Sequence, residues 1–572
     1  MAIPVRLDLC TAIAGASYAT PADVLACLRS FPFNETLRQN ILSTVSKVFD
    51  FYTFEDYYPK SSAPFPNMRH IRAGLARINT TSYSTDYDFN LDLYNFVNQL
   101  NDGHTLWLPS CYVTWESLLP TPVVSISVSG MEGVYIAPDA VDFMALLPPG
   151  FTEFYDSIGF NWQRLAGARV LRIEGMDPYD YVDWVADTVT GNYLDHGVRV
   201  NSVFTSYRLS GSSFSQKFGD LAGRVFSPVE NLTWAINCAA NGNTNGVDRR
   251  RTPNSLQLRP RLQPKGLSRP PSDAIGLPPK FQPSLPPVNN NASVMVSYLL
   301  PDGITGILFI GSFQDSDFEQ FQVDVVATIN SLKAAGATRL LIDLTNNPGG
   351  FICQGLFLHH GFQSAVRGNL LAQKIVREVI AQSISEDVSF YVPSQWASLN
   401  DALFLDNYNY IDPPIDVDIN GRMDATSQRF RDACPFSVPI SSLPPFDLTR
   451  VAIVTNGNCA STCAMFSTLM KERHNTTIAV FGGRPGQGIE FKGMAGNQVL
   501  EWADLDSEIK TAGLKDDPLA PPDLLVSANM RHNWRTAYSY LDEATPIGSS
   551  RTVRFPYTAD TYNDPQNLWI FA

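Results

Sequence analysis

The chain has 572 residues, a formal net charge of −14 and a pI near 5.0. This length exceeds what one hydrophobic core supports, so we expect two or three globular domains. The acidic balance argues against nucleic acid or an acidic membrane as the main partner, and no apolar run is long enough to span a bilayer.

The first region, 1–119, is predicted to be helical. Apolar residues recur at spacings of three and four over 21–101, as they do on one face of a helix. The last helix, 88–100, leads into Asn101-Asp-Gly-His104-Thr, where Gly103 is expected to end the helix and leave His104 on a loop. A loop histidine is free to act as a base, although most histidines are surface residues.

Residues 120–237 change to short strands and one helix. The strands are predicted at 123–128, 133–137 and 167–175, and the helix at 179–190. The pattern Gly-x-x-Val-x-x-Ile-x-Gly before this helix resembles a PDZ module, which binds a peptide as an added strand at a sheet edge. A β domain with a purely structural role fits the same pattern.

Residues 238–297 are predicted to be a linker. Asn-Gly repeats, scattered prolines and few large apolar residues leave too little apolar surface for independent folding. The basic run 249–251 is typical of a solvated tether, and a processing site is the alternative.

Residues 298–495 carry an α/β pattern. A strand at 304–310, an amphipathic helix at 318–335 and a buried strand at 338–344 predict a βαβ unit. The second strand ends in Thr-Asn-Asn-Pro-Gly349-Gly350, at the carboxyl end where open α/β sheets bind ligands. The N–H groups of these glycines could complete an oxyanion hole, or the loop could be an ordinary turn. Residues 371–446 are predicted to be an insertion into this core.

A second strand-to-helix turn follows the insertion. An apolar run at 451–454 meets an Asn-Gly turn and then a helical pattern that extends to Met470. Ser461 is thereby placed in the first helical turn, where unpaired N–H groups and the helix dipole favour a developing oxyanion. Ser461 is therefore a candidate nucleophile, and simple capping of the helix is the alternative.

The cysteines and the glycosylation sequons bear on metal binding and on the localisation of the protein. The eight cysteines lack the spacing of a zinc site, so no metal is expected. Five sequons, at Asn34, Asn79, Asn231, Asn291 and Asn475, favour a secreted glycoprotein. Against secretion, Arg6, Asp8 and Cys10 stand where a signal peptide needs an unbroken apolar segment. The localisation therefore stays open, with the secretory pathway or the extracellular space favoured.

Several motifs, in this order, resemble the tail-specific (C-terminal-processing) serine peptidases. They are Leu100-Asn-Asp-Gly-His-Thr, the PDZ-like pattern, Gly306-Ile-Leu-Phe-Ile, Leu341-Ile-Asp-Leu-Thr-Asn-Asn-Pro-Gly-Gly, Asn458-Cys-Ala-Ser-Thr-Cys-Ala-Met-Phe and Gly482-Gly-Arg-Pro-Gly-Gln-Gly. The set is most similar to the branch of chlamydial protease-like activity factor and its fungal secreted relatives. This resemblance implies an α/β protein with a helical N-terminal region, a PDZ-like β domain and a ClpP/crotonase-like catalytic core. Residues 496–572 would pack on that core.

The resemblance also assigns roles. Ser461 matches the nucleophile and His104 the base, and the amides near Gly349, Gly350 and Thr462 would form the oxyanion hole. No cofactor is implied.

Two positions depart from the family pattern. Gln487 stands where members with a Ser–Lys dyad carry lysine, and Lys492 lies off register, which gives more weight to His104. The third catalytic member would be Glu501, with Asp504 as an alternative, and both acids also fit a solvated surface.

The sequence therefore predicts a serine endopeptidase that cleaves a peptide or protein through an acyl-enzyme. Some fungal relatives are associated with trimming ribosomally made precursor peptides of secondary metabolites, and the resemblance suggests that role here. No nucleic acid is expected as a partner, and a homodimer is left open. A catalytically inactive peptide-binding scaffold is the competing interpretation, and an esterase with the same strand-to-helix turn around Ser461 is a third.

Overall fold

A computed structural model provides the structure of the chain. It describes residues 7–16, 19–55, 70–115, 122–146, 150–157, 159–190, 193–211, 213–222, 234–237, 256–258, 276–289, 293–359, 363–384, 390–419, 421–439, 443–491, 499–538 and 552–572. The basic run 249–251 and Lys492 lie outside the described residues.

The N-terminal region is helical, as predicted. Its helices are α1 (Leu7–Thr11), α2 (Pro21–Leu28), α3 (Glu35–Val48), α4 (Ile71–Thr80) and α5 (Asp86–Asn98). The side chains of Thr20, Asn34 and Thr85 cap α2, α3 and α5 by accepting a backbone N–H three residues on, which fixes where these helices begin.

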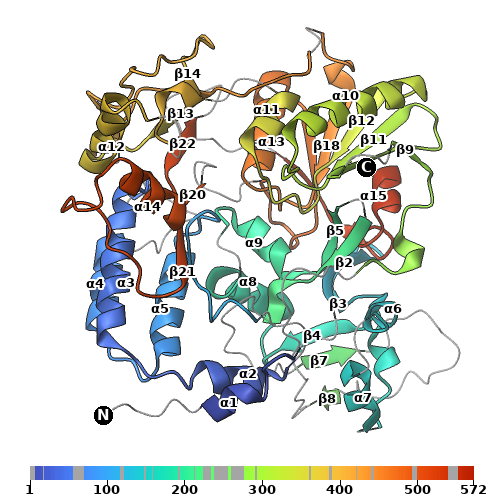
Figure 1. The fold of residues 1–572 in the computed structure, drawn as a ribbon. Helices are drawn as coiled ribbons and strands as arrows, with labels where there is room; N and C mark the ends of the chain where they lie inside the picture. Colours follow the sequence, from blue (N-terminus) through green and yellow to red (C-terminus); the bar gives the residue numbers. More distant parts are fainter. Residues whose placement is uncertain are drawn as a thin grey trace, which may run out of the picture.

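Two later helices share the core of this N-terminal region. They are α12 (Leu370–Ala381) and α14 (Trp502–Thr511), whose buried faces join the same apolar cluster as α2 to α5. Figure 1 shows α3, α4, α5, α12 and α14 on the left-hand side of the molecule. The segment that follows α12 forms short strand pairs: β14 (Trp396–Ala397) with β17 (Arg431–Asp432), and β15 (Ile415–Ile419) with β16 (Arg422–Thr426).

The middle of the chain forms a six-stranded sheet in the order β24-β2-β3-β4-β7-β8. Its strands are β2 (Val123–Val128), β3 (Met131–Ile136), β4 (Arg169–Ile173), β7 (Trp234–Asn237), β8 (Leu256–Leu258) and β24 (Tyr557–Thr558). Helices α6 (Ala140–Met144), α7 (Gly150–Ser157), α8 (Pro178–Thr188) and α9 (His196–Val203) accompany it. The strands and helix expected of a PDZ-like region are thus present.

The third region is a seven-stranded sheet in the order β23-β19-β18-β12-β11-β10-β9. Its strands are β9 (Pro287–Asn289), β10 (Met295–Leu299), β11 (Thr305–Ile310), β12 (Arg339–Asp343), β18 (Val451–Thr455), β19 (Thr477–Phe481) and β23 (Val553–Phe555). Strands β11, β12, β18, β19 and β23 are parallel, and α10 (Phe318–Ala334) makes the predicted βαβ crossover. These elements confirm the predicted α/β fold class.

The two faces of this sheet have different covers. Helices α10, α11 (Ile352–Leu358) and α13 (Thr462–His474) pack on one face. The hairpin of β5 (Ser206–Ser210) and β6 (Ser213–Lys217), together with the C-terminal helix α15 (Pro565–Phe571), packs on the other. The parallel strands are therefore buried on both sides, which accounts for their continuous apolar sequences.

The C-terminal segment joins the two large sheets. Strand β23 pairs with β19 of the seven-stranded sheet, and β24 then pairs with β2 of the six-stranded sheet. Helix α15 follows and buries Trp569, whose indole Nε1 donates a 2.7 Å hydrogen bond to the carboxylate of Asp343 at the end of β12. This last contact reaches the strand that precedes the Gly349-Gly350 turn.

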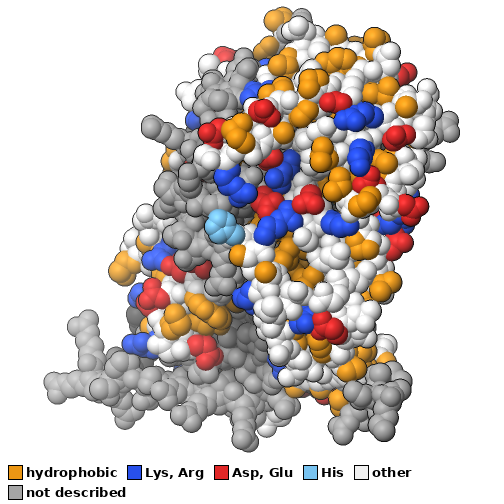
Figure 2. All heavy atoms as spheres, turned by 90° about the vertical axis from the view of Figure 1, so that its left-hand side faces the viewer, with side chains coloured by type: hydrophobic (Ala, Val, Ile, Leu, Met, Phe, Trp, Pro, Cys, Tyr) orange, Lys and Arg blue, Asp and Glu red, His pale blue; other side chains and the backbone are white. Residues whose placement is uncertain are grey.

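Charged side chains of both signs are mixed on the face that carries the N-terminal helices (Figure 2). Exposed ion pairs here include Arg72 with Asp50 at 2.8 Å and Lys510 with Asp523 at 3.0 Å. Each such pair stabilises the fold by about 0–1 kcal/mol, so the buried clusters carry the stability. No helix within the described ranges is long and apolar enough to cross a membrane.

Candidate active site

The site begins where two parallel strands end side by side. Strands β12 and β18 are in register, with Asp343 opposite Val454, and each continues into a Thr-Asn dipeptide. The two asparagines bond to each other: the Asn346 N–H donates to Asn456 Oδ1 at 3.2 Å, and Asn456 Nδ2 donates to Asn346 Oδ1 at 2.9 Å. This reciprocal pair fixes the loop of Gly349 and Gly350 to the loop between β18 (Val451–Thr455) and α13 (Thr462–His474), which we call the elbow.

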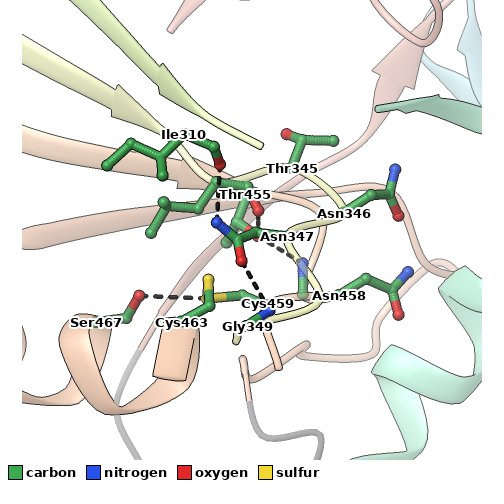
Figure 3. Close-up of a disulfide and its surroundings, with 12 residues drawn as sticks. Ile310, Thr345, Asn346, Asn347, Gly349, Thr455, Asn458, Cys459, Cys463 and Ser467 are labelled. Carbon is green, nitrogen blue, oxygen red and sulfur yellow. Dashed lines mark hydrogen bonds between the residues drawn. A yellow bond between two sulfur atoms is a disulfide. The ribbon is translucent and has the colours of Figure 1, made fainter. Parts of the chain in front are cut away.

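A third asparagine shapes the glycine loop itself. Asn347 Nδ2 donates to the carbonyl of Ile310 at 2.8 Å, and its Oδ1 accepts the N–H of Gly349 at 2.8 Å (Figure 3). Its backbone carbonyl accepts the N–H of Ala460 at 3.0 Å. The loop is therefore fixed to both neighbouring segments two residues before Gly349.

Ser461 does not adopt the backbone of an ordinary helix cap. Its φ and ψ are 53° and −121°, and its side chain makes no capping hydrogen bond to α13. A capping serine has an extended backbone and accepts an N–H of its own helix, so the capping interpretation does not fit. Non-glycine residues with positive φ cost of order 1–3 kcal/mol and occur preferentially at active sites. The strand, turn and helix around this residue are as predicted.

The predicted oxyanion residues lie together against this serine. A Cβ built on Gly349 would come within 2.4 Å of the Ala460 carbonyl oxygen and 2.7 Å of Ser461 Cβ, so only glycine fits. Thr462 Oγ1 donates to the carbonyl of Gly350 at 2.7 Å, which holds the loop over the first turn of α13.

The three amides differ in what they already bind. Gly349 N–H is taken by Asn347. Phe313 bonds to the carbonyl of Gly349 and the N–H of Phe351, so the N–H of Gly350 takes no part in that bridge. Thr462 is the first residue of α13, where N–H groups have no partner inside the helix. Gly350 and Thr462 are accordingly the better candidate donors.

Side chains of α9 hold the elbow in place through hydrogen bonds that the sequence did not predict. Asn201 Nδ2 donates to the carbonyls of Asn456 at 2.6 Å and Phe481 at 2.8 Å, and Ser202 Oγ donates to Asn458 Oδ1 at 2.9 Å. These residues come from the PDZ-like region and belong to no recognisable motif. The Asn346–Asn456 pair did leave a signal in the sequence, the Thr-Asn dipeptide found at the carboxyl end of both strands.

His104 lies on the loop after α5, as predicted, and its side chain is buried. Helix α5 ends at Asn98, and it is Asn101, not Gly103, that takes the left-handed backbone, with φ of 50°. Asn tolerates this conformation through its short polar side chain. Asp102 then holds the turn by accepting the N–H of His104 at 3.1 Å and the hydroxyl of Thr105 at 2.7 Å.

The surroundings of His104 favour its neutral form. Burial and, to a smaller extent, the positive charge of Arg531 lower the pKa of His104 to about 3. Within the described chain, its Nδ1 has no hydrogen-bond partner. The imidazole is therefore unprotonated at neutral pH. No hydrogen bond joins its Nδ1 to Ser461 or to any other described residue.

One continuous segment connects the surroundings of His104 to the helix of Ser461. Strand β1 (Leu106–Pro109) pairs with β21 (Ala528–Asn533), which runs on into β22 (Arg535–Tyr538). Ala537 of β22 packs with Met465 and Leu469 of α13 in one buried cluster. Met465 lies one turn, about 6 Å, along the helix from Ser461.

The proposed third member and the lysine position have other partners. Glu501, at the end of β20 (Val499–Glu501), pairs with Arg531 at 2.8 Å and accepts a hydrogen bond from Asn529. Asp504 lies in the first turn of α14, and burial raises its pKa. Gln487 Nε2 contacts Nδ1 of His196 at the start of α9. The structure thus groups Ser461 with Gly349, Gly350 and Thr462, and places Glu501 beside Arg531, whose charge acts on His104.

A second buried histidine, His532, makes the stability of the protein depend on pH. Neither ring nitrogen of His532, on β21, has a partner among the described residues, and burial lowers its pKa to about 3. An unfolded histidine has a pKa near 6.5, so below that pH the unfolded state binds a proton that the folded state does not. Each pH unit costs about 1.4 kcal/mol, or about 3 kcal/mol from pH 6.5 to pH 4.5.

His532→Leu should remove this penalty. We expect a variant close to wild type in stability at pH 7.5 and about 3 kcal/mol more stable than wild type at pH 4.5. Urea unfolding at the two pH values measures this. Burial raises the pKa values of Asp343 and Asp139 to about 6, and these acids act in the opposite direction, but equally in both proteins. An unchanged difference between variant and wild type at the two pH values would contradict the assignment.

Comparisons with known proteins agree with the resemblance that the motifs indicate. No family model matches the chain. Over 598 aligned positions it is 25% identical to "Peptidase S41 family protein phomP1" of Diaporthe leptostromiformis, with 86% of each chain covered. It is 29% identical to "Peptidase S41 family protein ustP" of Aspergillus flavus over 158 positions, which cover 22% of this chain and 33% of that protein.

Among solved structures, mature CPAF complexed with lactacystin aligns at a TM-score of 0.47 and 13% identity, over 94% of this chain and 97% of that one. The predicted resemblance to the tail-specific serine peptidases is confirmed by the family name that the curated relatives carry.

Proposed function

We propose that this chain, a serine peptidase related to Peptidase S41 family proteins, hydrolyses peptide bonds through an acyl-enzyme on Ser461. The observation that carries the proposal is the positive-φ backbone of Ser461 between β18 and α13, packed against the Gly349-Gly350 loop. A strand-to-helix elbow of this kind presents a hydroxyl without letting it cap its own helix.

The chemistry follows from the groups around that hydroxyl. Ser461 Oγ attacks the scissile carbonyl while His104, neutral at neutral pH, accepts its proton, a contribution of about 10²–10⁴-fold. The amides of Gly350 and Thr462 stabilise the oxyanion, each by about 2.7–4 kcal/mol. The imidazolium then protonates the leaving amine, and water hydrolyses the acyl-enzyme. No step needs a metal or a cofactor.

Glu501 is proposed to act on His104 through Arg531. It pairs with Arg531, whose positive charge opposes protonation of the imidazole. By offsetting that charge, the carboxylate would help His104 to hold the proton in the transition state. In this role Glu501 acts through Arg531 and is a positioning residue.

The substrate is proposed to be a ribosomally made precursor peptide. The curated relatives are fungal proteins, and the resemblance to the fungal branch implies this role. An extended peptide also suits the PDZ-like sheet, which can accept an added strand. Cleavage of flexible peptides but not of folded proteins is the expected pattern.

Ser461→Ala tests the function. Wild type should hydrolyse an unstructured protein such as casein, and the variant should lose at least about 10³-fold in activity while it unfolds like wild type. Peptide binding measured by fluorescence anisotropy should survive in the variant. Equal binding by both proteins with no hydrolysis by wild type would favour the peptide-binding scaffold instead.

A further inference from the structure

A disulfide encloses the proposed nucleophile. Cys459 and Cys463 are bonded at a sequence separation of 4, so Ser461 is the central residue of the five that the crosslink spans. Both cysteines are 0% exposed. Figure 3 shows the bridge beside the Asn347-Gly349 loop, with Ser467 of α13 next to Cys459.

Each end of the bridge is fixed to a different part of the site. Cys459 forms a parallel bridge with Asn347, and its N–H donates to the carbonyl of Gly457 at 2.8 Å. Cys463 lies in the first turn of α13, and its N–H donates to the carbonyl of Ala460 at 3.0 Å. The crosslink therefore ties the glycine-loop side of the elbow to the helix side, and the backbone between them must turn sharply.

The conformation of Ser461 needs such a constraint. A serine before a helix ordinarily relaxes to an extended backbone and caps the helix with its own hydroxyl, which would turn Oγ away from a substrate. A strained backbone persists only where its surroundings over-determine it. A small covalent ring around the residue, anchored at both ends, supplies that constraint directly.

The effect on overall stability should be small by comparison. In the chain-entropy account a disulfide stabilises more when it closes a longer loop. Cys10–Cys27, at a separation of 17 in the N-terminal helices, therefore stabilises more than Cys459–Cys463 at a separation of 4. A short crosslink at this position fits a local role better than a global one.

We propose that the Cys459–Cys463 disulfide is a positioning element of the active site that holds Ser461 in its reactive conformation. This inference rests on the proposed function. The bond forms during folding, when a disulfide donor takes up two electrons and two protons from the thiols. Once folded, the burial of both cysteines protects the bond from dissolved reductant.

The test compares two double variants with wild type. Cys459→Ala/Cys463→Ala should label with a fluorophosphonate probe at Ser461 at least about tenfold more slowly than wild type, and lose kcat on a peptide with little change in KM. Its urea unfolding midpoint should stay close to that of wild type. Cys10→Ala/Cys27→Ala, the matched control, should label at the wild-type rate even though its unfolding midpoint falls by as much or more.

The outcomes separate this inference from the function it rests on. Failure of wild type to label would refute the proposed function. Labelling of wild type and of Cys459→Ala/Cys463→Ala at equal rates would refute the positioning role and leave the function intact. If the alanine pair does not fold, Cys459→Val/Cys463→Ala restores most of the lost volume, and the same comparison of labelling rates decides.

Discussion

Trp569→Ala should lower the free energy of unfolding by about 3–5 kcal/mol, the cost of removing a buried tryptophan from a packed core. The side chain is 1% exposed, and its ring lies 5.1 Å from that of Tyr298. Its Nε1 also donates to Asp343, so truncation leaves a buried carboxylate without its shortest hydrogen bond. The loss should also reach the active site, because the same carboxylate accepts the N–H of Thr345 at 2.8 Å.

Urea unfolding of two further variants separates the contribution of the hydrogen bond to Asp343 from that of the packing of Trp569. Trp569→Phe keeps most of the packing and loses the hydrogen bond, for which we expect about 1.5–3 kcal/mol because the acceptor is charged. Ile570→Ala, next to it but 54% exposed, should stay within about 0.5 kcal/mol of wild type. A Phe variant as stable as wild type would show that the bond to Asp343 contributes nothing.

Gly349→Ala should destabilise the protein by about 2–5 kcal/mol and abolish labelling of Ser461. The residue has φ of +82°, which costs an L-amino acid about 1–2 kcal/mol. The new Cβ would also lie 2.4 Å from the Ala460 carbonyl and 2.7 Å from Ser461 Cβ, and such overpacking typically costs about 1–3 kcal/mol. Relief of the clash must move the elbow or the loop, which separates the hydroxyl from its oxyanion donors.

Gly303→Ala is the matched control for this change. Its φ of +72° is similar, but a Cβ there meets nothing within 4 Å. It should lose only the conformational cost and label at the wild-type rate. Equal losses of labelling in both variants would mean that the close approach of Gly349 to Ser461 has no bearing on reactivity.

The local elements of the site could be read from the sequence. The turn around Ser461 lies between an apolar β-branched strand and a helix with apolar periodicity, and the glycine loop follows a βαβ pattern. These signals depend on neighbouring residues, and the structure has each element in place. The Gly-Gly sequence predicted a close approach to a substrate, and what the structure shows is the close approach of Gly349 to Ala460 and Ser461.

Contacts between distant residues could not be read in this way. Asn201 reaches the elbow from α9, Trp569 reaches β12 from the last helix, and Cys459 chooses Cys463 among several possible partners. No periodicity or turn signal encodes such pairings. The burial of His104 could not be predicted for the same reason, because it depends on β21 and its neighbours, which are distant in the sequence.

The central claim is that His104 activates Ser461, and the rate of Ser461 labelling by a fluorophosphonate probe tests it most directly. His104→Leu and His532→Leu each replace a buried histidine whose pKa is lowered to about 3, so both should alter acid stability alike. The account predicts that His104→Leu labels about 10²–10⁴-fold more slowly than wild type while His532→Leu labels at the wild-type rate. Labelling of Ser461 at the wild-type rate in His104→Leu would contradict the account.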